Sequence, residues 1–113
     1  MVLKVYNLKG TVTKGSVNTY IASLVTPAGV TRTMQEVRYY CSLPADVEAQ
    51  LLLSTEVIYD LEGQVNDTYK LPYPANLTLR EGDELRLVCT NRNTTTDATI
   101  KVELIVEETK AGT

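Results

Sequence analysis

The sequence contains no histidine, tryptophan or phenylalanine, and only two of its 113 residues are cysteines. Without histidine, the Ser-His-Asp and Cys-His catalytic arrangements and the histidine-containing zinc sites are excluded. Two cysteines are also too few for a zinc site with four thiolate ligands. We therefore expect a protein that is not an enzyme and that uses no metal or other cofactor.

Positive charge is also scarce, with 11 lysines and arginines against 14 acidic residues and a formal net charge of −3. A nucleic-acid-binding protein needs concentrated positive charge to displace phosphate counterions, so we expect no nucleic-acid partner. No apolar run approaches the roughly 20 residues that span a bilayer, which predicts no membrane insertion. The start "MVLKVYNLKG" lacks the apolar block of a signal peptide, which favours synthesis in the cytoplasm. A signal removed earlier would instead imply secretion.

The sequence does contain apolar and polar residues that alternate with a period of two, which indicates strands with one covered face. Two clear examples, "ELRLVCT" at 84–90 and "TIKVELIVE" at 99–107, flank turn-forming residues, and we interpret the pair as a hairpin. The preceding "NLTLREGDE" predicts a third successive antiparallel strand. The inward-facing residues predicted from these segments are Leu77, Leu79, Leu85, Leu87, Cys89, Ile100, Val102, Leu104 and Val106.

Further strands are predicted in the first half of the chain. "MQEVRYYCSL" at 34–43 alternates, and "LLLSTEVIYDL" at 51–61 is interpreted as one strand. "VNTYIASLVT" at 17–26 is apolar on both faces, which predicts a central or doubly covered strand. Residues 2–8 and 10–13 add one or two more, and helix formers after Pro44 predict a single helical turn.

These patterns predict one all-β domain over residues 1–108, followed by a flexible tail at 109–113. Seven or eight short strands with a turn about every ten residues are typical of an antiparallel β-sandwich, and we expect a jelly-roll-like one with at most one short helical turn.

The two cysteines, Cys41 and Cys89, both fall on inward faces, so they can meet across the core. A disulfide between them would stabilise the fold by about 4 kcal/mol. Two reduced thiols that pack as small core residues are the alternative, which a cytoplasmic location favours. Both alternatives stay open at this point.

Four apolar residues interrupt rows that should be polar and face outward. If they lie on one sheet, they form a patch that a partner subunit would cover, whereas the alternative is cover by a neighbouring loop. The residues are Tyr40, Ile58, Val88 and Ile105.

Two tyrosines, Tyr69 and Tyr73, lie in "DTYKLPYPANL", whose prolines exclude a central strand. They serve either at an interface, where tyrosine is enriched, or as a lid over the end of the core.

Acidic and amide residues gather in two turns, which raises the question of a calcium site. The spacing matches no EF-hand loop, and no pair of acids is placed as in a glycosidase, so we interpret them as solvated turns. They are Glu81, Asp83, Glu84, Asn91, Asn93 and Asp97.

The series of short strands, with "NLTLREGDELRLVCTNRN" and the final "IKVELIVEE", resembles small jelly-roll or β-sandwich virion proteins of the decoration, cement or spike type. This resemblance implies a structural protein, made in the host cytoplasm, that assembles with itself and with a capsid or tail protein. It carries over no functional residue. The alternative is an extracellular carbohydrate- or protein-binding β-sandwich module, with Tyr69, Tyr73 and the 91–97 loop in its binding site and a disulfide between the cysteines.

Overall fold

The structure, a computed structural model, describes residues 2–61, 69–72 and 77–110, with only the backbone at 59–60 and 69–72. The described residues contain nine strands and no helix, and the single turn expected after Pro44 is present: the Leu43 carbonyl oxygen accepts from the backbone N–H groups of Asp46 and Val47, each at 3.1 Å, before strand begins again at Val47. The strands are β1 (Val2–Val12), β2 (Thr19–Val25), β3 (Val30–Cys41), β4 (Val47–Leu53), β5 (Glu56–Asp60), β6 (Tyr69–Pro72), β7 (Thr78–Leu79), β8 (Glu84–Asn91) and β9 (Ala98–Lys110).

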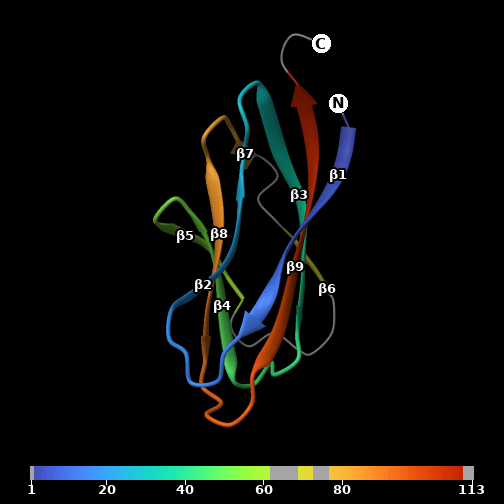
Figure 1. Cartoon of the computed structure of the whole chain (residues 1–113). Helices are drawn as coiled ribbons and strands as arrows, with labels where there is room; N and C mark the ends of the chain where they lie inside the picture. The colour runs from blue at the N-terminus through green and yellow to red at the C-terminus, as the bar shows by residue number, and fades with distance from the viewer. Residues whose placement is uncertain (1, 62–68, 73–76, 111–113) are drawn as a thin grey trace.

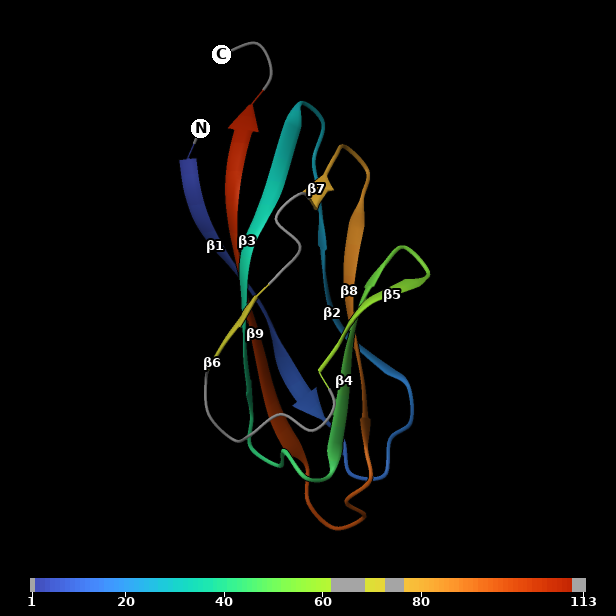
Figure 2. The same ribbon diagram turned by 180° about the vertical axis from the view of Figure 1, so that it is seen from behind.

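The strands form two antiparallel sheets that pack face to face (Figures 1 and 2). One sheet has the order β1-β9-β3-β6, with β7 beside β3 as well, and the other has the order β2-β8-β4-β5. The pairings are nested along the chain: β1 pairs with β9, β2 with β8, β3 with β6 and β7, and β4 with β5. This is the jelly-roll arrangement, and it confirms the predicted all-β sandwich.

Alternate side chains of both sheets fill the space between them, as the two-residue period predicts. Every inward-facing residue predicted in β8 and β9 is buried, and so are Val37, Tyr39 and Cys41 of β3. Leu79 is buried as well, and Leu77 packs against the same core. The strand assignments from periodicity are therefore confirmed for the second half of the chain.

The predicted pairing of these strands is wrong, because β8 and β9 do not form a hairpin. β8 pairs with β2 and β4, whereas β9 pairs with β1 and β3 in the opposite sheet. The segment between them crosses from one sheet to the other. The buried Asn91 holds this crossing, because its Nδ2 donates to the carbonyl oxygens of Val12 and Thr96, each at 3.1 Å. Alternation is equally compatible with both arrangements, since each strand has one inward face in either case.

Two predictions in the first half of the chain are also wrong. Residues 51–61 form the β4–β5 hairpin, not one strand, and the chain turns at Ser54, whose φ is 58°. A bulge places Tyr59 opposite Leu51 and Val57 opposite Leu52. β2, expected to be central or covered on both faces, is the edge strand of the four-stranded sheet, and none of its side chains is fully buried.

The C-terminal strand extends beyond the predicted domain boundary. β9 continues to Lys110, which lies opposite Val30 of β3, so the segment expected to be a tail begins inside a strand. Residues 111–113 are outside the described part. No helix in the described residues is long and apolar enough to cross a membrane.

The two sheets approach each other closely where β1 passes β2, and Gly10 permits this contact. A Cβ atom on Gly10 would lie 2.7 Å from Cγ2 of Ile21. Because isoleucine is branched at Cβ, this methyl group has little freedom to move away. A glycine at this position therefore fixes how the edge of one sheet lies on the other.

We expect Gly10→Ala to lower the free energy of unfolding by about 1–3 kcal/mol through this overlap. In an Ile21→Ala background, where Cγ2 is absent, the same substitution should cost clearly less. Urea denaturation of the four proteins in this double-mutant cycle measures the difference. Equal costs in the two backgrounds would show that the contact with Ile21 does not limit this position.

Candidate protein interface

An apolar strip lies on the outer face of the five-stranded sheet, beside the free edge of β1. We define the strip as Leu3, Val5 and Ile105. Leu3 and Val5 are 65% and 53% exposed, and Val5 lies directly opposite the half-buried Ile105 of β9. β1 pairs only with β9, and no described strand lies beyond it (Figures 1 and 2). The predicted outward orientation of Ile105 is confirmed.

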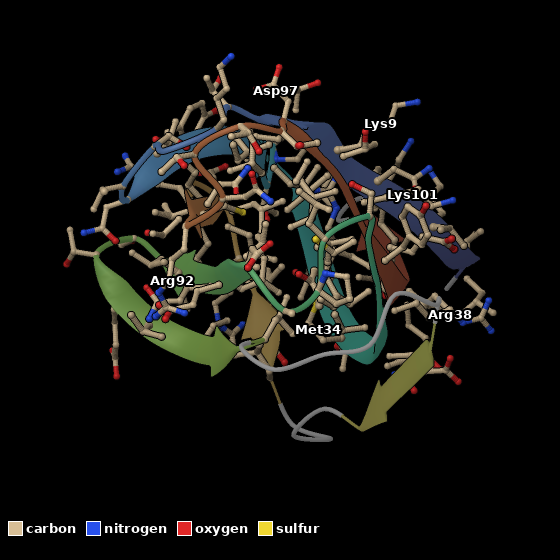
Figure 3. The ribbon with its side chains drawn as sticks, turned by 90° about the horizontal axis from the view of Figure 1, so that it is seen from below. Lys9, Met34, Arg38, Arg92, Asp97 and Lys101 are labelled. Atoms are coloured by element: carbon tan, nitrogen blue, oxygen red, sulfur yellow. The ribbon has the colours of Figure 1, made fainter. Side chains whose placement is uncertain are left out.

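A basic hollow lies further along the same face, and Tyr40 forms part of it. Tyr40 on β3 is half-buried and lies opposite Lys101 of β9, which in turn lies opposite Lys9 of β1. The hollow has a volume of about 660 Å³, and Thr11 and Thr99 line it as well. Figure 3 shows Lys9 and Lys101 extending from the same side of the molecule, away from the core.

The other predicted interface residues do not join this face. Val88 faces outward from the four-stranded sheet, opposite the 56% exposed Tyr20 of β2. The expected outward orientation of Ile58 is wrong, because Ile58 packs against the core. The two-residue turn at Ser54 and Thr55 pairs Leu52 with Val57, so Val57 shares the outer face with Leu52, and Ile58, the next residue, faces the core. The four predicted residues therefore do not form one patch.

The two tyrosines of the proline-rich segment have separate outcomes. Tyr69 lies in β6, where its backbone is opposite Tyr39 of β3. β6 is an edge strand, which confirms that the prolines exclude a central position. Tyr73 lies outside the described residues. The interface role of both tyrosines stays a prediction.

The cysteines are free, buried thiols on the facing sheets, Cys41 on β3 and Cys89 on β8. Burial, together with the nearby Cys41, raises the pKa of Cys89 from 9.0 to about 12. The thiol therefore remains protonated near neutral pH. It packs as a small core side chain.

The acidic and amide residues of the turns form hydrogen bonds within their own loops or with neighbouring loops. Asp83 accepts a hydrogen bond from the backbone N–H of Arg80 at 2.8 Å, and Asp97 accepts one from that of Lys14 at 2.9 Å. Asn93 Oδ1 accepts from the backbone of the Thr95–Thr96 segment. Within the described ranges, no group of three or more His, Cys, Asp or Glu residues is arranged to hold a metal ion.

A buried ionic cluster, which the sequence pattern does not predict, lies at the end of the sandwich near the termini. Its centre is the Glu108 carboxylate, which is only 5% exposed and contacts Lys4 Nζ at 2.8 Å and Arg32 Nε at 2.9 Å. The Tyr6 hydroxyl donates to the same carboxylate at 2.5 Å. Arg32 also donates to the carbonyl oxygen of Val25 at 3.2 Å, which ties the cluster to β2. These contacts hold β1, β3 and β9 together beneath the apolar strip.

The cluster holds the pKa of Glu108 at about 2, well below 4.5. Hydrogen bonds from Lys4, Tyr6 and Arg32 cause this shift, in that order of size. These partners shield the carboxylate from water, although Glu108 lies only two residues from the end of β9. In the sequence, these residues are visible only as charged residues within alternating segments. That pattern does not indicate that Lys4, Arg32 and Glu108, which are far apart in the chain, are partners.

The sequence pattern also does not predict four residues of the candidate interface, Leu3, Val5, Lys9 and Lys101. In "VLKVYNLKG" both faces of the strand contain apolar residues, so the alternation does not indicate which face is covered. The tertiary structure decides this by placing Leu8 in the core and Val5 outside.

Comparison with known proteins finds no matching family model, no similar curated sequence and no similar solved structure.

Glu108 should make stability depend on pH in the acid range. Because its pKa is lowered on folding, its contribution is complete above about pH 4.5 and is lost as the pH falls towards 2. We expect Glu108→Gln to lower the free energy of unfolding at pH 7 by about 1–3 kcal/mol, since it leaves the buried Arg32 poorly paired. The difference from the unmodified protein should shrink as the pH approaches 2.

Urea denaturation between pH 2 and pH 7 measures this effect. Glu107→Gln is the matched control, because Glu107 is the neighbouring glutamate on the outer face of β9. Glu107→Gln should leave the pH dependence nearly unchanged. A difference between Glu108→Gln and the unmodified protein that does not vary with pH would contradict the role of the carboxylate.

The cysteines should resist alkylation in the folded protein. Raising the pKa from 9.0 to about 12 lowers the thiolate fraction of Cys89 by about a thousandfold, and burial also blocks access. Iodoacetamide labelling followed by mass spectrometry should show no modification under native conditions and two modified cysteines in urea. Rapid native labelling, or no free thiol after unfolding, would contradict this prediction.

Proposed function

We propose that the protein is a non-enzymatic structural protein that assembles with copies of itself and with a larger shell or tail. A virion component of the decoration, cement or spike type fits this activity best. The observation that carries the proposal is the apolar strip of Leu3, Val5 and Ile105 beside an unpaired sheet edge. Exposed apolar area next to free backbone hydrogen-bonding groups is a surface that a partner stabilises by covering it.

The free edge of β1 supports this proposal because it lacks the usual protection. Natural edge strands are shortened, bulged, or interrupted by proline or charge, which prevents unwanted pairing. β1 is 11 residues long, contains no proline, and keeps a continuous register with β9 from Val2 to Val12. One of its two lysines, Lys4, is bound by Glu108. A partner strand therefore finds an open and regular edge.

A second apolar area supports contacts on more than one side. On the outer face of the four-stranded sheet, Tyr20 lies opposite Val88, and Leu52 lies opposite the 47% exposed Val57. Two separate contact areas suit a protein that joins both its own copies and another protein. Tyr40, Tyr69 and Tyr73 remain proposed contributors to these contacts.

Assembly is tested by light scattering coupled to size exclusion over a hundredfold range of concentration. We expect a mass at least twice the 12.5 kDa of a single chain. Val5→Glu should weaken the association at least about tenfold, because it places a charge in the strip that becomes desolvated on contact.

Val17→Glu is the matched control, because Val17 is also exposed but lies outside the strip, in the loop before β2. It should leave the association unchanged. A monomer at every concentration, with Val5→Glu and Val17→Glu indistinguishable from it, would refute self-assembly. For the virion proposal, mass spectrometry of purified particles should find the chain in constant proportion to the shell protein, and its absence from such particles would refute it.

A further inference from the structure

The basic hollow has a floor and two walls that come from three adjacent strands. The backbone of β9 from Thr99 to Lys101 forms the floor. Lys9 and Thr11 of β1 line one side, and Tyr40 of β3 lines the other. The volume of about 660 Å³ is within the range of sites that bind small molecules or peptide side chains. A polar and aromatic hollow of this size can therefore accommodate a ligand.

The two lysines of the hollow are in electrostatic conflict with each other. Lys9 and Lys101 are direct cross-strand neighbours, so their Cβ atoms are about 5 Å apart and their like charges destabilise the sheet. Lys9 forms no ion pair with any described residue. The protein as a whole is acidic, with a net charge of −3, yet it concentrates two cations here. An anion placed between them would remove the conflict.

Lys101 is able to bind such an anion without leaving its present partner isolated. Its Nζ lies 3.0 Å from Glu103, and Glu103 lies directly opposite Arg38 of β3. When Lys101 turns towards a ligand, Arg38, whose guanidinium lies 3.7 Å from the Glu36 carboxylate, is still the cross-strand neighbour of Glu103 on the same face. Figure 3 shows Arg38 on the same side of the molecule as Lys9 and Lys101, whereas Arg92 lies on the far side, over β4. The ion pair between Lys101 and Glu103 therefore does not prevent Lys101 from binding a ligand.

The cross-strand pairs that line the hollow have the same spacing as side chains on one face of an extended peptide. The lysine pair and the Thr11–Thr99 pair follow each other at a spacing of two residues, which is about 7 Å along a strand. Side chains on one face of an extended peptide have the same repeat. An acidic residue above the lysines therefore places the next residue but one above the threonine hydroxyls. Tyr40 supplies an apolar wall for the stem of the acidic side chain.

We propose that the basic hollow binds an extended acidic segment of a partner protein, with one carboxylate held between Lys9 and Lys101. The choice of a protein over an acidic glycan rests on the proposed function, whereas the anion site itself does not. The segment would add specificity to an assembly that the apolar strip drives, because charged contacts select partners and register.

The proposal is tested by isothermal titration with the synthetic peptide acetyl-TETET-amide, at low salt and in 0.5 M NaCl. The titration is repeated with the Val5→Glu variant, which weakens self-association. Peptide binding is thereby measured separately from assembly. We expect binding at low salt, weakening in 0.5 M NaCl, and at least tenfold weaker binding of the neutral peptide acetyl-TQTQT-amide.

Lys9→Gln and Lys101→Gln should each weaken peptide binding about tenfold. Lys14→Gln, which removes the same charge from an exposed lysine outside the hollow, should not change it. Equal affinity for the two peptides, or equal effects of Lys9→Gln and Lys14→Gln, would overturn the proposal. Binding of an oligogalacturonate through Lys9, without binding of the acidic peptide, would also overturn it.

Thermal unfolding gives a readout that needs no ligand. Because Lys9→Gln removes the repulsion between neighbouring lysines, it should raise the melting temperature slightly relative to Lys14→Gln. A melting temperature below that of Lys14→Gln would show that the lysines are not in conflict, and the case for an anion between them would fail.

Discussion

Burial of one face of each sheet against the other is the interaction on which the rest of this protein depends. Neither sheet is able to form from neighbouring segments, because β1 pairs with β9 and β2 with β8, across most of the chain. The nested pairs become stable only when alternate side chains of both sheets exclude water together. Folding of this topology must therefore bring distant segments together early, and loop closure opposes that step.

This way of filling the core determines where function can reside. The space between the sheets is occupied by aliphatic side chains, Tyr39 and two buried thiols. Polar and unpaired groups are found instead on the outer faces and at the edge of β1. The apolar strip and the basic hollow are adjacent regions of one outer sheet face.

The ionic cluster of Glu108 performs a structural task that apolar residues would not perform at that position. A carboxylate with three donors satisfies its hydrogen-bonding capacity while joining three strands. The guanidinium of Arg32 also lies over the Tyr6 ring, 4.3 Å from its centroid, which packs the cluster tightly. The position of the apolar strip, on the opposite face of the same strands, follows from this anchor.

The amino-acid sequence by itself determined which segments are strands and which side chains face inward, because a two-residue period directly reflects the geometry of a strand. It correctly placed Leu85, Leu104 and Cys89 in the core, and proline correctly kept β6 at an edge. Bulges and strand partners were decided by the tertiary structure alone. Ile58 was misplaced because the chain turns at Ser54 and the turn reverses which residues face inward. β8 and β9 were wrongly paired because a hairpin and a crossing satisfy the same pattern. The apolar strip, the basic hollow and the Glu108 cluster each join residues from strands distant in sequence, so they exist only after the sheets have formed.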